Sequence, residues 1–286
     1  MTSDIASIQL SGVTKPTVVI QPRNGLFDLE LGTLWQYREL LYFFVWRDIK
    51  VRYKQTVIGA AWAIIQPLFT MIVFSLFFGK LAGIPSEGLP YPLFYYSALL
   101  PWMYFANALT NATNSMVEHQ HVITKIYFPR LLLPLASVLS GLVDFAVAFT
   151  ILIGMMVFYG IVPTGTTLLL PFFLLLAVLT ALGFGLWLSA LNVIYRDVRY
   201  AVSFLVQFWM FASPVAYPSS LVPERWQSLY GLNPMAGVIE GFRWALTGHG
   251  QPSALLIGAS GGAVVLLVIA GLIYFQRTEG TMADVV

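Results

Sequence analysis

The sequence predicts an all-α membrane protein with six transmembrane helices, an N-terminal amphipathic interfacial helix and two short re-entrant helices between spans five and six. Composition is the first observation: 58% of the 286 residues are hydrophobic and 10% are charged, against about 25% charged in soluble domains. The second is a series of long uncharged stretches, and the third is the clustering of Lys and Arg between alternate stretches. Much of the surface is therefore expected to face lipid.

The composition also excludes several classes of protein. The net charge is +2 and no stretch is rich in Lys and Arg, which argues against a protein that binds nucleic acid. The chain has no cysteine, which excludes disulfides and thiolate metal sites. It has no phosphate-binding G-x-x-x-x-G-K-[ST] loop and no H-E-x-x-H pair. We expect this chain not to be an enzyme and to bind no metal or cofactor.

Six stretches are long enough to span a bilayer, which takes about 20 mostly apolar residues. We expect the spans at 57–78, 91–114, 132–159, 168–191, 200–217 and 253–275. The third and fourth are divided by "GIVPTGTT", whose Gly and Pro indicate a turn.

The segment 217–252 is less regular. It is interrupted by Pro218, Pro223 and Pro234, and its semi-apolar pieces of 10–14 residues are too short to cross. Such pieces are tolerated at membrane depth where they lie against protein or water. We expect two re-entrant helices at about 218–248.

The orientation follows from the positive charges, which favour the cytoplasmic side. With the N-terminus inside, three of the 15 Lys and Arg residues lie outside: Lys80, Arg225 and Arg243. The other twelve lie inside: Lys15, Arg23, Arg38, Arg47, Lys50, Arg52, Lys54, Lys125, Arg130, Arg196, Arg199 and Arg277. This distribution predicts six spans with both termini in the cytoplasm.

The segment 34–55 combines charged and aromatic residues at helical spacing, with polar side chains on one face and Leu40, Leu41 and Phe44 on the other. A helix of this kind lies along a membrane surface. Its basic face fits an anchor on anionic lipid or a docking surface for a cytoplasmic partner, and periodicity leaves both open. The expected organisation is a cytoplasmic segment 1–33, the helix 34–55, a permease region 56–276 and a cytoplasmic tail 277–286.

Three further features carry polar or aromatic groups. The loop 117–130 is polar, but His119 and His121 diverge on a helix, so it fits a solvated or partner-facing loop better than a metal site. Asp144 is the charged residue inside the predicted spans, and helix packing or a polar channel lining is favoured for it over proton coupling. The many aromatic residues fit either a lipid-interface belt or a pore on which sugar rings slide.

Four stretches carry a resemblance to a known family. They are "WRDIKVRYKQTVIGAAWAIIQPL" (46–68), "KIYFPRLLLPLA" (125–136), "LNVIYRDVRYAVSFLVQFWMFASPVAYP" (191–218) and "LNPMAGVIEGFRWALTG" (232–248). On these the chain resembles the membrane-spanning permeases of bacterial ABC exporters for polysaccharides such as O-antigen, capsule and teichoic acid, which are of the ABC-2 type.

The resemblance implies a homodimer in the bacterial cytoplasmic (inner) membrane. It also implies two copies of a separate ATP-binding subunit, which hold the ATP and Mg, and a lipid-linked polysaccharide as substrate. It places an ATPase-docking surface on the interfacial helix: Arg38, Glu39, Arg47, Asp48, Lys50, Arg52 and Lys54. It places a cytoplasmic gate or coupling loop at His121, Lys125, Tyr127, Pro129 and Arg130.

Three further sets complete this expectation. The cytoplasmic turn of Arg196, Asp197 and Arg199 either only anchors the ends of two spans or also lies near the gate or the ATPase, with Arg196 and Asp197 as an ion pair. The aromatic residues expected to line a glycan channel are Tyr95, Tyr96, Trp102, Tyr104, Trp209, Phe211 and Tyr217. The periplasmic gate is expected at Pro218, Trp226, Asn233, Pro234, Arg243 and Trp244.

Three alternatives stay open. An ABC exporter for a small lipid or drug would share this layout. A polytopic membrane enzyme acting on lipid-linked sugars would need paired carboxylates, and no D-x-D is present. A proton-driven flippase would depend on Asp144.

Overall fold

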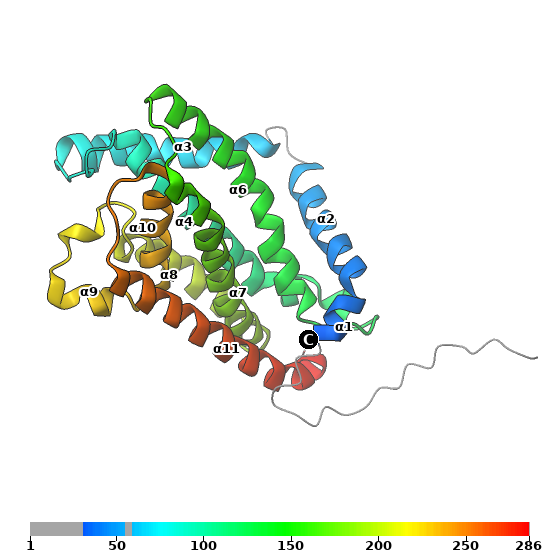
Figure 1. Ribbon diagram of the computed structural model, residues 1–286. Coiled ribbons are helices and arrows are strands. Elements are labelled where there is room, and N and C mark those ends of the chain that lie inside the picture. The colour runs from blue at the N-terminus through cyan, green and yellow to red at the C-terminus, as the bar shows by residue number, and fades with distance from the viewer. Residues whose placement is uncertain (1–30, 55–58, 286) are drawn as a thin grey trace, which may run out of the picture.

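The computed structural model describes residues 31–54 and 59–285, and within them every regular element is a helix (Figure 1). Short 3₁₀ turns lie at Gly59–Ala61, Gly165–Leu169 and Ser219–Leu221, and a π-helical turn at Ser75–Leu81 continues α3. The α-helices are α1 (Leu31–Gln36), α2 (Arg38–Lys54), α3 (Trp62–Phe74), α4 (Tyr91–Glu118), α5 (Gln120–Ile123), α6 (Leu132–Phe158), α7 (Leu170–Ile194), α8 (Val198–Ala212), α9 (Glu224–Tyr230), α10 (Pro234–Thr247) and α11 (Ala254–Val285).

Helix α4 is the centre of the bundle and packs against α3, α6, α7, α8 and α10. Tyrosines join it to α6: the hydroxyl of Tyr96 donates to the carbonyl of Ala148 at 3.1 Å, and that of Tyr104 to the carbonyl of Val138 at 3.2 Å. On the α7 side, the amide of Asn192 donates to the carbonyl of Thr113 at 3.0 Å. Because protein covers most of α4, it needs little lipid-facing apolar surface.

Helices α7 and α11 approach each other closely through glycine. A Cβ atom at Gly271 would lie 2.4 Å from the carbonyl oxygen of Gly183, and one at Gly183 would lie 2.9 Å from the side chain of Leu267. Small residues at membrane helix contacts allow backbones to approach in this way. The two helices therefore form a tight pair, in which α7 packs against α4.

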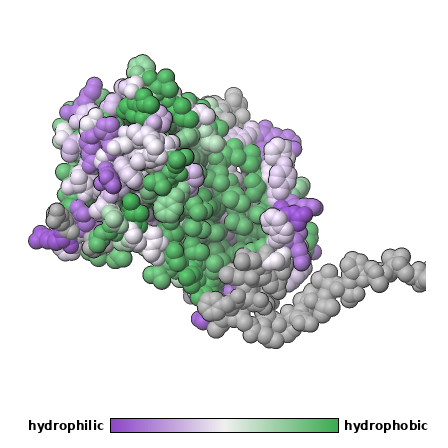
Figure 2. Space-filling model, in the orientation of Figure 1, coloured by the Kyte–Doolittle hydropathy of each residue, from purple (hydrophilic) through white to green (hydrophobic). Residues whose placement is uncertain are grey.

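Four helical segments are long and apolar enough to cross a membrane: Trp62–Leu81, Leu132–Phe158, Gly165–Ile194 and Ala254–Gly280. They correspond to the first, third, fourth and sixth predicted spans; the first starts at Trp62, directly after the 3₁₀ turn Gly59–Ala61. Figure 2 shows the same feature on the surface, where a broad apolar band separates polar side chains on either side.

The second and fifth predicted spans differ from these four. Helix α4 is long, but its Asn, Thr and Ser residues lower its hydropathy. Helix α8 has 15 residues, about 22 Å at 1.5 Å per residue, against a hydrocarbon core of about 30 Å. It ends at Ala212, five residues before the expected Tyr217, because Ser213 is extended (φ −108°, ψ 156°) before Pro214. The count of six spans stays a prediction.

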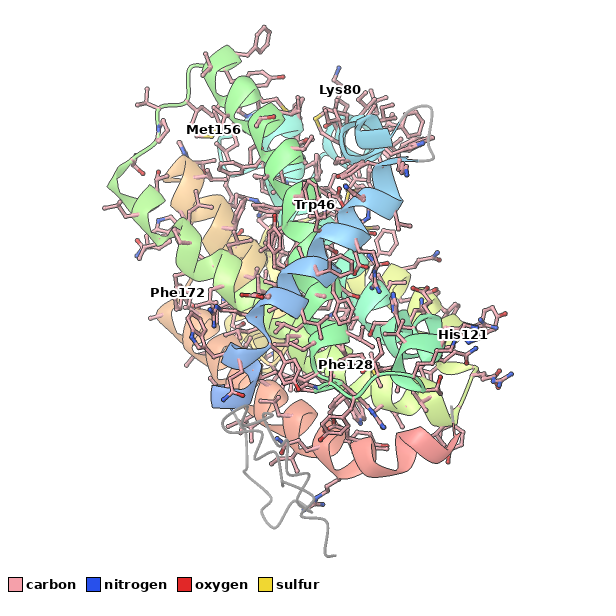
Figure 3. The ribbon with its side chains drawn as sticks, turned by 90° about the vertical axis from the view of Figure 1, so that its right-hand side faces the viewer. Trp46, Lys80, His121, Phe128, Met156 and Phe172 are labelled. Carbon is pink, nitrogen blue, oxygen red and sulfur yellow. The ribbon has the colours of Figure 1, made fainter. Side chains whose placement is uncertain are left out.

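The N-terminal helix is interrupted where a continuous helix over 34–55 was expected. α1 ends at Gln36 and α2 begins at Arg38. Figure 3 shows α2, with Trp46 near its middle, lying obliquely across α6. The start of α1 and the end of α11 lie at the same end of the bundle (Figure 1).

Candidate functional site

A cavity of about 360 Å³ opens between the C-terminal end of α2 and helices α3, α4 and α6. Such a volume is in the range of small-ligand sites. Trp62 and Tyr104 contribute aromatic rings to its wall. Its polar lining comes from Arg52, Tyr53, Gln66, Asn107, Asn111 and Asp144.

Asp144 of α6 is held at this wall by two neighbouring residues of α2. One carboxylate oxygen accepts a hydrogen bond from Arg52 in an ion pair, and the other accepts one from the hydroxyl of Tyr53. The side chains of Arg52 and Asp144 keep 30% and 24% of their exposure. Burial and the hydrogen bond to Asp144 raise the pKa of Tyr53 to about 12, so its hydroxyl stays a donor at neutral pH.

The cavity also holds three carboxamides that sequence reasoning missed. The side-chain amides of Gln66, Asn107 and Asn111 make no hydrogen bond to a residue that the structure describes. Nearby Pro67 has no N–H, so the carbonyl of Ala63, another residue of the cavity wall, lacks its ordinary helical partner. The signal was present in the sequence, because Asn107, Asn111 and Asn114 follow helical spacing inside a predicted span.

The seven residues expected to dock an ATPase separate into outward and inward groups. Arg38, Glu39, Lys50 and Lys54 are exposed. Arg47 instead pairs with its neighbour Asp48 at 2.8 Å and stacks on the buried ring of Phe44 at 4.9 Å. Arg52 is turned toward Asp144.

The outward face of α2, together with α1 just before it, also carries aromatic side chains. These exposed residues are Trp35, Tyr42, Phe43 and Trp46. Arg38 lies over the ring of Trp35 at 5.5 Å, and Lys50 over that of Trp46 at 5.1 Å. The face is therefore both basic and aromatic.

The polar loop after α4 is attached to α2 and α11 near its C-terminal end and is largely exposed before that point. The ring of Phe128 is buried against Phe44 of α2, with centroids 5.4 Å apart, as Figure 3 places it beneath that helix. Arg130 bonds to Glu279 of α11 through its backbone N–H and its guanidinium. His121, Lys125 and Tyr127 are exposed ahead of these attachments, and Pro129 between them is half-buried. The loop thus touches α2 and α11 together.

The turn 195–199 is exposed, but the expected ion pair between Arg196 and Asp197 is wrong. The ion pairs that the structure shows do not include either residue. Arg199 instead stacks on the ring of Tyr200 at 4.8 Å. Asp197 immediately precedes α8, where its negative charge favours the helix N-terminus without a side-chain cap.

The seven aromatic residues expected in a channel mostly pack inside the chain. Tyr95, Tyr96, Trp102 and Tyr104 are buried. Trp209 and Tyr217 are half-buried, whereas Phe211 is 51% exposed. The rings closest to Trp209 in the described chain are those of Phe184, Phe105 and Trp102, with centroids 4.9, 5.1 and 6.3 Å away. These contacts join α8 to α4 and α7.

The expected periplasmic-gate residues include two structural attachments. Asn233 accepts hydrogen bonds from the backbone of Met235 and the indole of Trp209, and donates to Ser213 at 2.9 Å. It therefore caps α10 and fixes the chain leaving α8. Pro234 starts α10, Pro218 is buried, Trp244 is half-buried and Trp226 is 50% exposed.

Arg243 is fully buried on α10. It pairs with Glu240 at 3.0 Å, donates to the carbonyl of Pro214 at 2.9 Å and lies 3.8 Å from the ring centroid of Phe94. Glu240 in turn accepts from the backbone N–H of Ser219 at 3.0 Å. The pair thus attaches the segment after α8 to α10, and the charge of Arg243 is neutralised inside the chain.

One short sequence pattern is similar to an enzyme motif. "GASGG" at 258–262 fits the G-x-S-x-G of hydrolase nucleophiles. Ser260, however, is buried inside α11, where it donates to the carbonyl of Gly231 at 3.0 Å and accepts from the N–H of Gly237 at 3.1 Å. It serves helix packing between α10 and α11.

Comparison with known proteins agrees with this architecture. Residues 39–247 match the ABC-2 type transporter family. The chain is 32% identical over 250 residues to the O-antigen export system permease protein RfbA of Myxococcus xanthus, covering 86% of this chain and 95% of the relative. It is 28% identical over 248 residues to the protein of that name in Klebsiella pneumoniae, with the same coverage. It is 22% identical over 246 residues to the polysialic acid transport protein KpsM of Escherichia coli, covering 83% and 93%.

The family match covers well over half of the chain, and one relative is 32% identical over nearly its whole length. This chain therefore belongs to the ABC-2 type transporter family.

Proposed function

We propose that this chain is the permease subunit of an ABC exporter that moves a lipid-linked polysaccharide outward across the cytoplasmic membrane. The observation that carries the proposal is the similarity to O-antigen and polysialic acid export proteins along most of the chain. The apolar helices and the broad apolar band support the membrane location.

In this proposal the permease is a homodimer with six spans per chain and both termini in the cytoplasm. The adjacency of the start of α1 and the end of α11 supports termini on one side. Helices α4 and α8 would supply the second and fifth spans, with α4 protected by its protein neighbours. Helices α9 and α10 would be the short re-entrant pair on the opposite side.

Energy would come from two copies of a separate ATP-binding subunit. The exposed charges of α2 and the exposed loop at Lys125 and Tyr127 are the surfaces we assign to this partner. Phe128 contacts Phe44, and Arg130 contacts Glu279, so a movement of the loop would pass to both α2 and α11. ATP and Mg would stay on the partner subunit.

A deletion strain tests this function. Cells without this chain should lose surface polysaccharide and accumulate the lipid-linked glycan inside, and the intact gene should restore export. Unchanged surface polysaccharide, together with an altered distribution of a lipid or drug, would instead favour the exporter of small molecules.

A further inference from the structure

We propose that the cavity between α2, α3, α4 and α6 binds a sugar unit of the exported glycan through the carboxamides of Gln66, Asn107 and Asn111. This inference rests on the proposed function and names a substrate site within one chain.

The first argument is hydrogen-bonding capacity. Each carboxamide offers two donors and an acceptor, and none of the three is used by a residue in the described ranges. Gln66 and Asn107 are exposed and Asn111 is half-buried, so all three can reach a ligand. Lipid chains offer these amides no hydrogen-bond partner, and polar groups left unsatisfied in lipid are costly. A hydroxyl-rich group such as a sugar has both donors and acceptors, which can pair with the carbonyl oxygens and N–H groups of the carboxamides.

The second argument is shape and ring surface. The volume of about 360 Å³ suits a small polar unit. Trp62 and Tyr104 stand at the wall beside the carboxamides, and aromatic rings pack against the C–H-rich faces of sugars. Amides next to aromatic rings favour a neutral polyol over an anion.

The third argument is charge. The carboxylate of Asp144 already accepts from Arg52 and Tyr53, so the ion pair leaves the cavity nearly neutral. A diphosphate would need free cationic donors, whereas the groups without protein partners here are amides. The two α2 residues also hold the end of that helix against α6, which defines this side of the cavity.

The test uses the full-length permease in lipid nanodiscs without its ATPase. One probe is the lipid-linked glycan isolated from cells lacking the permease, and the other is the same polyprenyl diphosphate without sugar. The variant is Asn107→Leu/Asn111→Leu. The side chains of Asn107 and Asn111 make no hydrogen bond to a described residue, so we expect the variant to fold normally. Thr150→Val is the control, because Thr150 is exposed on α6 and bonds to its own helix.

Because both amides lose their hydrogen bonds to the sugar, binding of the lipid-linked glycan should weaken at least tenfold. Binding of the bare lipid diphosphate should stay within twofold, and the control should match wild type for both probes. Equal affinity of wild type and double variant for the glycan would overturn the proposal, as would equal losses for both probes. A strain that still exports polysaccharide without this chain, alongside sugar-selective binding, would contradict the proposed function and leave the site intact.

Discussion

Arg52 on α2 and Asp144 on α6, 92 residues apart in the sequence, form an ion pair at the wall of the polar cavity. Tyr53 donates to the same carboxylate, so the negative charge inside the third predicted span contacts two side chains of α2. This arrangement supports a positioning role for Asp144. It attaches the interfacial helix directly to the bundle.

We predict that Asp144→Asn lowers the free energy of unfolding by about 1–3 kcal/mol, less than the 3–5 of a fully buried pair because both side chains are partly exposed. Thermal unfolding in detergent measures the change. In a double-mutant cycle with Arg52→Gln, the second change should add little. Additive losses would show that the two residues do not act as a pair.

Trp209→Ala should destabilise the chain by about 3–5 kcal/mol, because it removes a large ring from between α4, α7 and α8. It also removes the indole donor to Asn233. Phe211→Ala is the matched control on the same helix, since its ring is about half exposed, and we expect a much smaller loss. Equal stabilities of the two variants in thermal unfolding would argue against a packing role for Trp209.

Replacing Arg243 with Met should be strongly destabilising, by about 3–5 kcal/mol, because it leaves the carboxylate of Glu240 buried without its cation. The double variant Glu240→Gln/Arg243→Met removes both charges and should recover much of that loss. Unfolding of the two variants in detergent compares them directly. A double variant less stable than the single one would show that hydrogen bonds to Ser219 and Pro214, rather than charge, dominate this cluster.

Charge reversal on the exposed face of α2 tests the docking surface. Lys50→Glu/Lys54→Glu should reduce co-purification with the ATP-binding subunit at least tenfold, because like charges would replace complementary ones across the contact. Arg225→Glu, an exposed basic residue on α9 at the far side of the bundle, is the control and should co-purify normally. Unchanged co-purification of the α2 variant would assign this face to lipid alone.

The sequence predicted the helices that are bounded by strong signals. α6 and α7 differ from the expected spans by three residues or fewer, because a long apolar run, in which Asp144 is the one charged residue, is divided by Gly and Pro. α8 was misjudged because hydropathy continues past Ala212, whereas the backbone turns at Ser213 before Pro214. The burial of α4 was also missed, since window composition carries no information about neighbouring helices.

The site was harder to predict for the same reason. The partner of Asp144 lies on a helix that the sequence assigned to a cytoplasmic surface, and no local pattern joins Arg52 to position 144. The aromatic residues of α4 were expected in a channel because composition alone cannot separate packing from pore lining. The sequence shows Asn107 and Asn111 at helical spacing, but only the structure shows that both line the same cavity.

The most direct test is transport by the purified parts. The permease and its ATP-binding subunit would be reconstituted in liposomes that carry the lipid-linked glycan, and movement of the glycan across the bilayer would be followed with an impermeant lectin. We predict movement that requires ATP, both subunits and the glycan. Movement at the same rate without ATP or without the second subunit, or none with all components present, would contradict this account.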